Sequence, residues 1–267
     1  MADLHIHTKF SPDSSEEPQA YIDEAILKKE KIIGFSEHMD FDYLALKLKF
    51  KPTDICKYFD YIKELKKTNE SNIKVLCGVE FGFCAATLAK DKYIELEKLL
   101  RFDYVINSVH VVDGLESYFQ PYFKGKTKQL AYDRYFETVL DSLNANYDYQ
   151  IIGHLGYVAR NAPYENAKIQ INEHTKIIDE ILKTAIRLEK TIELNTSVRT
   201  AGSITLPTFE IIQKYYDLGG RLIAISSDAH RISQMYFNFD AVKQELKKIG
   251  FRQTVYYEDK KLKFNNI

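Results

Sequence analysis

Residues 222–230 read LIAISSDAH, a short apolar run that ends in a carboxylate and an imidazole. An apolar run of this length, without alternating polar side chains, is typical of a parallel strand covered on both faces. We predict a strand over 222–228, and six other segments have the same character. They are residues 4–7, 32–37, 75–80, 104–110, 149–154 and 191–195.

Amphipathic stretches separate these runs and predict helices. The first, residues 18–30, begins with Pro18, which suits a first helical turn. The others are residues 53–68, 90–100, 127–143, 172–190, 207–218 and 238–249. Strands that alternate with helices predict a parallel sheet. We therefore expect an α/β protein in which residues 1–267 form a single closed barrel, with an open doubly wound sheet as the alternative. Residues 254–257 and 261–264 predict a small terminal hairpin.

Composition excludes several classes of protein. The chain has 267 residues with 37 Lys+Arg against 38 Asp+Glu, so no basic excess favours nucleic-acid binding. No apolar run approaches the roughly 18 residues of a membrane span, and we find no secretory signal. The three cysteines, Cys56, Cys77 and Cys84, lack CxxC spacing, which argues against a disulfide framework and a thiolate metal site. We expect a cytoplasmic protein with reduced thiols that binds neither nucleic acid nor membrane.

The positions of the histidines are the main functional signal. The chain has seven, and six of them lie at or just past the predicted C-terminal end of a strand. These six are His5, His7, His38, His110, His154 and His230. In barrels and in open α/β sheets alike, this edge carries the active site. We therefore expect the six rings to converge. The seventh, His174, begins a predicted helix, and we expect it to be solvated and without a functional role.

Three carboxylates share this placement. Glu80 ends an apolar run abruptly, Asp228 lies two residues before His230, and Asp13 follows His7 in a Ser/Pro loop. Imidazole and carboxylate together suit Zn²⁺, Mn²⁺ or Fe²⁺. Because the candidate ligands exceed the need of one ion, we predict two or three divalent ions that share a bridging carboxylate.

These motifs together resemble those of the polymerase and histidinol phosphatase (PHP) family. The resemblance covers nearly the whole chain. It is carried by DLHIHT (3–8), SEH (36–38), GVE (78–80), SVH (108–110), GH (153–154) and SDAH (227–230). Within the family it is closest to the monofunctional histidinol-phosphate phosphatases, through the chain length, the extension at 37–40 and the Asp113-Gly114 pair.

The resemblance implies a distorted seven-stranded (β/α) barrel with a trinuclear site at the C-terminal ends of the strands. By motif, the first metal would take His5, His7, Glu80 and Asp228. The second would take Glu80, His110 and His154, and the third Asp13, His38 and His230. Many relatives have histidine where this chain has Asp13.

The implied reaction is the hydrolysis of L-histidinol phosphate in histidine biosynthesis. Three divalent ions, three carboxylates and a bridging hydroxide leave a charge of about +2, which a phosphate monoester dianion would balance. We expect in-line attack by the metal-bridging hydroxide without a covalent phosphoenzyme. The proton donor to the leaving group stays open between Asp228, His230 and a metal-bound water.

Loops on the expected active face supply candidate substrate contacts. Arg160 and Arg199 follow strand ends, and a guanidinium fork matches phosphate oxygens. Ser197 is a further phosphate candidate. The ammonium and imidazole of histidinol phosphate call for carboxylates and aromatic faces. Asp42, Tyr43, Glu116 and Tyr118 are available for that purpose.

Two other functions remain open. One is another PHP hydrolase, such as a phosphotyrosine phosphatase or a nucleotide phosphoesterase or phosphodiesterase. The other is a metal-binding domain without catalysis. Turnover of a diester but not a monoester would indicate a diesterase, and tightly held metal without hydrolysis would indicate the non-catalytic domain.

Overall fold

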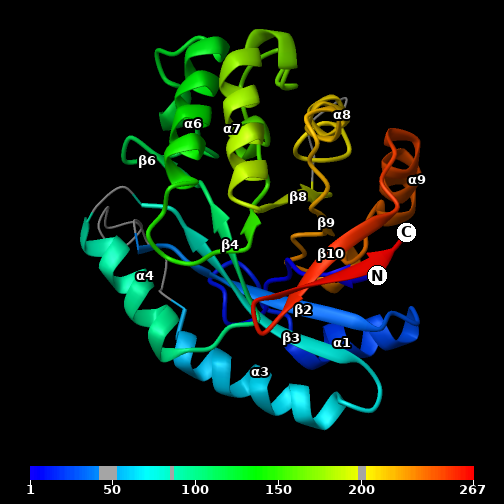
Figure 1. The fold of residues 1–267 in the computed structure, drawn as a ribbon. Coiled ribbons are helices and arrows are strands. Elements are labelled where there is room, and N and C mark those ends of the chain that lie inside the picture. Colours follow the sequence, from blue (N-terminus) through cyan, green and yellow to red (C-terminus); the bar gives the residue numbers. More distant parts are fainter. Residues whose placement is uncertain (42–52, 85–86, 198–202) are drawn as a thin grey trace.

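Seven parallel strands form the centre of the molecule (Figure 1). The computed structural model describes residues 1–267 except 42–52, 85–86 and 198–202. The strands are β1 (Ala2–Asp3), β2 (Ile32–Met39), β3 (Lys74–Gly82), β4 (Tyr104–Ser108), β7 (Ile151–Ile152), β8 (Thr191–Asn195) and β9 (Ile223–Ser226). They follow one another in the sheet in this order, so each crossover places a strand beside its predecessor.

The two edges of the sheet meet just beyond β1 and β9. Ile6 and Ala229 form a parallel bridge, and the backbone N–H of His7 donates to the carbonyl of Ala229 over 2.9 Å. The sheet is therefore a nearly closed barrel. The predicted seven-stranded barrel is confirmed, and the open doubly wound alternative is wrong.

Several predicted strands are shorter in the structure. The first strand is regular at Ala2–Asp3, before the predicted range 4–7, where residues exchange single backbone hydrogen bonds with Ala229 and Ser36 and only Ile6 forms an isolated bridge. The strand predicted over 149–154 is reduced to Ile151–Ile152. His5, His7 and His154 therefore lie outside the regular ladder, whereas His38 and Glu80 lie within β2 and β3.

Helices surround the barrel, as predicted (Figure 1). They are α1 (Pro18–Leu27), α3 (Ile55–Asn69), α4 (Thr87–Leu99), α5 (Gln120–Phe123), α6 (Lys128–Ser142), α7 (Thr175–Arg187), α8 (Phe209–Asp217) and α9 (Phe239–Ile249). Short 3₁₀ turns occur at Tyr157–Ala159, Ile171–Glu173 and Ile232–Gln234. The seven predicted helices agree with the observed bounds within three residues, and among the described residues the short α5 is an α-helix that was not predicted.

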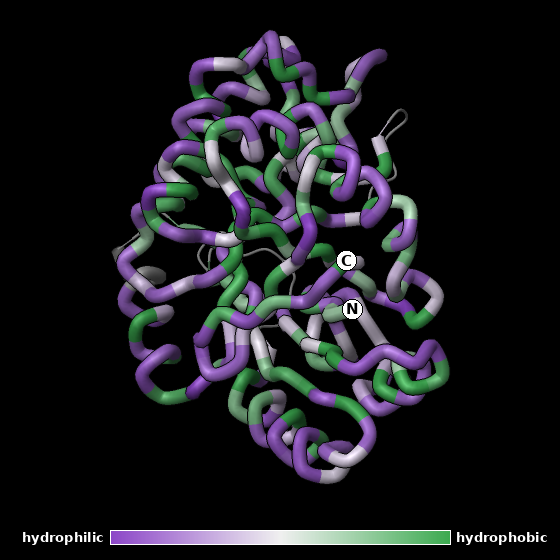
Figure 2. The backbone as a smooth tube through the Cα atoms, turned by 45° about the vertical axis from the view of Figure 1, so that its right-hand side comes forward, coloured by the Kyte–Doolittle hydropathy of each residue, from purple (hydrophilic) through white to green (hydrophobic). Residues whose placement is uncertain are grey.

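Each outer helix packs an apolar face against the barrel. Tyr21 of α1 and Tyr58 of α3 join Ile33, Phe35 and Val75 of the strands in one buried cluster. In Figure 2 hydrophobic and hydrophilic residues alternate along the outer helices, as expected of helices with one buried face. Among the described residues, no helix has the length and apolar character to cross a membrane.

The barrel interior is apolar at the N-terminal ends of the strands. Tyr104 fills it there, and its hydroxyl lies 2.6 Å from the carbonyl oxygen of Leu4. Gly78 makes room for this ring, since a Cβ at that position would lie 2.2 Å from it. The predicted hairpin is present as β10 (Gln253–Glu258) and β11 (Lys261–Asn266), and Val255 and Tyr257 pack against the same cluster. The hairpin therefore covers this end, and the polar interior faces the opposite one.

His174 corrects one sequence prediction. It does not lie in solvent: only 2% of the residue is exposed, and it precedes α7. Its Nδ1 lies 2.6 Å from an oxygen of Asp133, and its ring packs near Tyr132 and Phe136 of α6. His174 does begin a helix, but its ring lies in the contact between α6 and α7, which no local pattern revealed.

Candidate metal centre

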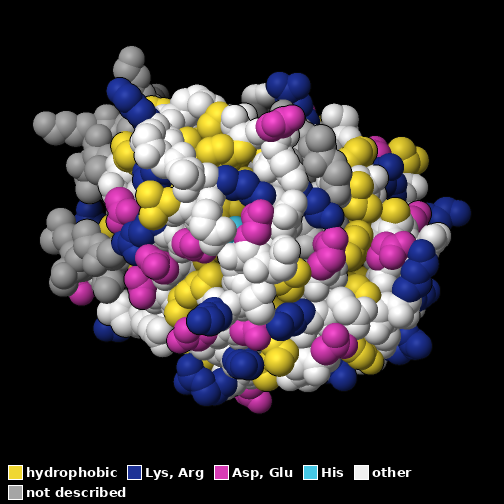
Figure 3. Space-filling model, turned by 90° about the horizontal axis from the view of Figure 1, so that it is seen from above, with side chains coloured by type: hydrophobic (Ala, Val, Ile, Leu, Met, Phe, Trp, Pro, Cys, Tyr) yellow, Lys and Arg dark blue, Asp and Glu magenta, His cyan; other side chains and the backbone are white. Residues whose placement is uncertain are grey.

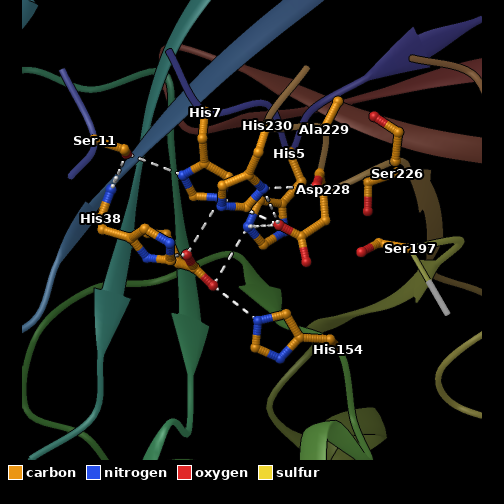
Figure 4. Close-up of polar contacts among 12 residues, drawn as sticks. His5, His7, Ser11, His38, His154, Ser197, Ser226, Asp228, Ala229 and His230 are labelled. Atoms are coloured by element: carbon orange, nitrogen blue, oxygen red, sulfur yellow. Dashed lines mark hydrogen bonds and ion pairs between the residues drawn. The ribbon is translucent and has the colours of Figure 1, made fainter. Parts of the chain in front are cut away.

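Six histidines from five different strand ends converge at the open end of the barrel. His5 and His7 follow β1, His38 lies on β2, and His110, His154 and His230 follow β4, β7 and β9. Figure 4 shows His5, His7 and His230 beside Asp228, with His38 and His154 farther from it. The convergence expected from the sequence is thus present.

Glu80, on β3, lies at the centre of the group and is fully buried. Its Oε1 lies 2.9 Å from His154 Nε2 and 3.3 Å from both His5 Nε2 and His110 Nε2. Its Oε2 lies 2.8 Å from His38 Nδ1 and 3.6 Å from His7 Nε2. Although burial opposes it, the charges of His5, His38 and His110 hold the pKa of Glu80 well below its usual range. The carboxylate is therefore ionised and reaches imidazoles on both sides.

Asp228 is a second buried carboxylate in the group. Its Oδ1 lies 3.3 Å from His7 Nε2 and 3.7 Å from His5 Nε2, while Oδ2 accepts from Arg160 over 2.8 Å. Its backbone has a φ of 51°, a left-handed conformation that is uncommon outside glycine. Such a conformation persists only where the surrounding structure imposes it, which fits a side chain held in place for function.

Asp13 lies at the rim of the group. Its Oδ2 is 2.9 Å from His230 Nε2 and 3.5 Å from His38 Nε2. Its side chain is 41% exposed, in contrast to the buried Glu80 and Asp228. Asp13 therefore faces the pocket from outside the histidine cluster.

The donor set fits divalent metal ions. Ligand atoms lie within 4.8 Å of one another in the triplets His7–His38–His230, His5–Glu80–His154, His5–His7–Asp228 and His38–Asp40–His110. Within the described part of the chain, the buried His5 Nε2, His7 Nε2 and Glu80 Oε2 make no hydrogen bond of suitable geometry, although each lies within 3.3 Å of a group of the cluster. Buried polar atoms are rarely left in this state, and these three face one another. Nitrogen and carboxylate oxygen are the ligands that zinc takes in proteins.

Burial also keeps one ring neutral. It lowers the pKa of His7 to about 3, together with the nearby charges of His38 and His230. A neutral imidazole is the form that binds a metal. His7 therefore requires no deprotonation before it can act as a ligand at neutral pH.

Two carboxylates that orient the histidines were missed by the sequence analysis. Asp40 Oδ1 lies 2.7 Å from His110 Nδ1, and Glu193 Oε1 lies 2.5 Å from His5 Nδ1. Glu193 also accepts from the backbone N–H of His154. Partners of this kind fix the ring orientation and tautomer of metal-binding histidines. The sequence did contain a signal for Glu193, because it lies inside the apolar strand predicted over residues 191–195. A buried carboxylate without a partner is rare, so a partner for Glu193 could have been expected.

A pocket of about 600 Å³ opens onto the cluster. In Figure 3 a small area of histidine colour lies at the bottom of a hollow, with basic and acidic side chains around it. The candidate substrate residues Arg160, Ser197, Glu116 and Tyr118 all line this pocket. Arg199 and Asp42, predicted for the same role, lie outside the described residues, as does Tyr43.

Arg160 and Glu116 are held by specific partners. Arg160 reaches both Asp228 and the side-chain oxygen of Asn195, at 2.8 and 3.2 Å. Its guanidinium lies over the ring of Tyr157, 5.0 Å from the centroid. The hydroxyl of Tyr157 donates to Glu116 over 2.9 Å. Tyr157 thus separates a cationic side of the pocket from an acidic side.

Comparison with known proteins identifies the family. A family model described as the PHP domain matches residues 3–197. The chain belongs to the PHP family. The matched range includes Glu80, the central carboxylate, and ends before Asp228 and His230.

Curated relatives cover this PHP chain almost completely. A probable histidinol-phosphatase of Clostridium acetobutylicum is 35% identical over 237 residues, which is 89% of both chains. The histidinol-phosphatase of Lactococcus lactis is 30% identical over 269 residues, covering 98% of this chain and 96% of the relative.

A solved structure has the same fold as this PHP chain. It is histidinol phosphate phosphatase from Lactococcus lactis in complex with zinc, L-histidinol and phosphate. The TM-score is 0.87 at 28% sequence identity, over 98% of each chain. The barrel and its rim are therefore common to both proteins.

Proposed function

We propose that this PHP protein is a metal-dependent phosphomonoesterase that hydrolyses L-histidinol phosphate to L-histidinol and phosphate. The observation that carries the proposal is the match over 98% of the chain to a phosphatase complexed with zinc, histidinol and phosphate. The cluster of imidazoles and carboxylates at the open end of the barrel supports it independently. We infer that residues 1–267 act as one catalytic domain.

The proposed ligands divide into three sets. The first is His5, His7, Glu80 and Asp228; the second is Glu80, His110 and His154; the third is Asp13, His38 and His230. Two contacts support Glu80 as the bridging group, because its two oxygens face different imidazoles, His154 and His38. We propose two or three ions, with zinc as the first choice and manganese or iron as alternatives.

Bound divalent ions would supply two effects, a lowered pKa for water and stabilisation of charge on the phosphoryl oxygens. The protein's own residues must then hold the phosphate in line. Arg160 is placed for this, since its guanidinium lines the pocket and is anchored by Asp228. Ser197 lines the same pocket, and we propose Arg199 as a second clamp on the same grounds of loop position.

The acidic side of the pocket suits the remainder of the substrate. We propose that Glu116 pairs with the substrate ammonium and that Tyr118 packs against the imidazole. Tyr157 supports both, because it donates to Glu116 and its ring lies 6.0 Å from that of Tyr118. Asp42 is proposed for the same region. This arrangement separates the two charged ends of the substrate.

The leaving alkoxide needs a proton, and the proposed sources are Asp228, His230 or a metal-bound water. Asp228 and His230 both line the pocket. The Nδ1 of His230 lies 3.0 Å from the carbonyl oxygen of Asp228, so the two groups are held next to each other. We propose that His230 carries the proton and that Asp228, a carboxylate that accepts from Arg160, holds it at the leaving-group side.

The test is a substrate panel with metal analysis on the same preparation. The panel contains histidinol phosphate, phosphotyrosine, a nucleoside monophosphate, p-nitrophenyl phosphate and bis-p-nitrophenyl phosphate. We expect the highest kcat/KM for histidinol phosphate and at least two equivalents of metal per chain. Equal kcat/KM for histidinol phosphate and p-nitrophenyl phosphate would overturn the substrate assignment. Preferred turnover of bis-p-nitrophenyl phosphate would indicate a PHP phosphodiesterase. The highest kcat/KM for phosphotyrosine would indicate a phosphotyrosine phosphatase.

A further inference from the structure

A buried chain of hydrogen bonds lies behind His7, on the side away from the proposed metals. It runs from Glu37 through Ser11 to the imidazole. Glu37 is on β2, and none of its surface is exposed; Ser11 is in the loop after His7 and is 3% exposed. The Ser11 hydroxyl lies 2.5 Å from Glu37 Oε2 and 3.1 Å from His7 Nδ1. Neither Glu37 nor Ser11 has a role in the proposed reaction.

The donors around Glu37 set the direction of this chain. The backbone N–H of Thr8 lies 3.1 Å from both carboxylate oxygens, and the Thr8 hydroxyl lies 2.6 Å from Oε1. The Thr8 N–H can only donate, so both oxygens of Glu37 act as acceptors, as in an ionised carboxylate, which only accepts hydrogen bonds. The hydroxyls of Thr8 and Ser11 must therefore both donate to it. The single proton of Ser11 is committed to Glu37, and its oxygen is left to accept.

The acceptor role of Ser11 determines the tautomer of His7. Figure 4 shows Ser11 between His7 and His38. The Ser11 oxygen accepts from the backbone N–H of His38 over 3.1 Å and faces His7 Nδ1. Since that oxygen can only accept, Nδ1 of His7 carries the proton. The lone pair is then on Nε2, which lies 3.3 Å from Asp228 and 3.6 Å from Glu80.

We propose that Ser11, itself held by Glu37, is a positioning residue that fixes the tautomer of His7 and aims its Nε2 at the metal centre. The inference rests on the proposed function, because it concerns a ligand of the proposed metals. His5 and His110 contact carboxylates directly, through Glu193 and Asp40. His7 is instead oriented by the hydroxyl of Ser11, and the carboxylate of Glu37 contacts this hydroxyl rather than the ring.

The packing around His7 gives a physical reason for this difference. Its ring is stacked between those of His38 and His230, at centroid distances of 4.1 and 4.3 Å, and its Nε2 already faces Asp228 and Glu80. A third carboxylate in contact with the ring would add negative charge to a buried site. The Ser11 hydroxyl gives the same orientation and keeps the negative charge of Glu37 one group farther from the ring.

Zinc affinity of variant proteins tests the proposal. After metal removal, zinc is titrated by calorimetry into the wild type, Ser11→Ala, Ser11→Thr and Thr8→Val. Loss of an outer partner of a ligand costs about 10- to 100-fold in metal affinity. We expect that loss for Ser11→Ala and near wild-type affinity for Ser11→Thr, which restores the hydroxyl. Thr8→Val is the matched control, because it also removes a hydroxyl bond to Glu37 but touches no imidazole.

The near-isosteric variant Glu37→Gln tests the direction of the hydrogen bond between Ser11 and His7. Its amide can donate to the Ser11 oxygen, which frees the Ser11 proton to turn toward His7 Nδ1 and moves the ring proton to Nε2. We expect a loss of zinc affinity similar to that of Ser11→Ala. Long-range ¹H–¹⁵N NMR of the metal-free wild type reads the tautomer directly and needs no variant. It should show His7 protonated at Nδ1.

The outcomes separate the two proposals. Wild-type protein that binds no zinc overturns the metal-dependent function. Wild-type protein that binds zinc while Ser11→Ala binds it equally well overturns the positioning role alone. An Nε2-protonated His7 in the wild-type spectrum also overturns it.

Discussion

At the scale of single residues, the proposed site depends on charge buried among imidazoles. Glu80 is fully buried, and its oxygens face nitrogens of five histidines within 3.6 Å. A buried carboxylate is costly unless cations or hydrogen-bond donors compensate it. The histidines provide such partners in the metal-free protein, and divalent ions would provide stronger ones. The same residue therefore serves both the fold and the proposed chemistry.

Removing a proposed ligand should lower metal content and activity together. His154 contacts Glu80 through Nε2 at 2.9 Å. We expect His154→Ala to lose at least one equivalent of metal and to lower kcat/KM by more than about 100-fold, since loss of an outer partner alone costs 10- to 100-fold. Elemental analysis and histidinol phosphate kinetics on one preparation check this. A full metal complement in the variant would show that the second ligand set is wrong.

Removing Arg160, the proposed phosphate clamp, should lower activity without removing the metal ions. Arg160 lines the pocket but belongs to none of the ligand sets. We expect Arg160→Ala to lower kcat/KM by about 10²- to 10³-fold, the usual cost of losing a charge-stabilising donor, and to hold the wild-type metal content at saturating zinc, because Arg160 is a partner of Asp228 and not itself a ligand. Arg160→Lys should recover part of the activity, because it restores charge without the fork. Wild-type kcat/KM in the alanine variant would contradict the assignment.

At the scale of elements, adjacent strands supply the barrel interior with side chains of alternating size. Leu76 and Glu80 of β3 point inward on either side of Gly78, and Tyr104 of β4 occupies the space that the glycine leaves. The large ring marks the boundary between the apolar floor and the polar rim. Packing at this level therefore sets the depth of the proposed site.

A side chain at position 78 should destabilise the protein. A Cβ there would lie 2.2 Å from ring atoms of Tyr104. Overpacking of this kind costs about 1–3 kcal/mol of folding free energy. We expect Gly78→Ala to unfold at lower denaturant concentration by that amount. The double variant Gly78→Ala/Tyr104→Leu should show a smaller cost for the alanine than the single variant does. Additive costs would mean that the ring is not the obstacle.

At the scale of the whole molecule, buried tyrosines connect stability to alkaline pH. Tyr58 and Tyr104 are fully buried, and burial, the largest cause, raises the pKa of each well above 10. In the unfolded chain such groups ionise near pH 10. Above that pH the unfolded state binds fewer protons than the folded state. Their contribution to stability is thus present below pH 10 and is lost as pH rises beyond it.

Tyr58→Phe isolates this effect from other titrating groups. At pH 8 the variant should be less stable by about 1 kcal/mol, because the hydroxyl bonds to the carbonyls of Phe35 and Gly78 are lost. The difference should shrink as pH rises above 10, since only the wild type loses the contribution of this tyrosine. Urea unfolding at several pH values between 8 and 11 measures it. A constant difference across that range would contradict the prediction.

The order of elements and the edge that carries the histidines could be predicted from the sequence alone. Hydrophobic periodicity and helix-start signals such as Pro18 depend on the residues of one segment alone. They can therefore be recognised without knowledge of the tertiary structure. The position of a residue at a strand end is equally local. This is why His5, His38 and His154 could be expected at one edge before their distances were known.

Only the tertiary structure decided which side chains meet across the barrel. Glu193 and His5 are 188 positions apart, and Asp40 and His110 are 70 apart. His174 reads as an exposed helix start, yet its neighbours on α6 bury it. The bridge between Ile6 and Ala229 that closes the barrel is likewise absent from any local pattern. Local periodicity places a residue on a face of its own strand, whereas a pair across the barrel depends on the register and closure of all the strands between.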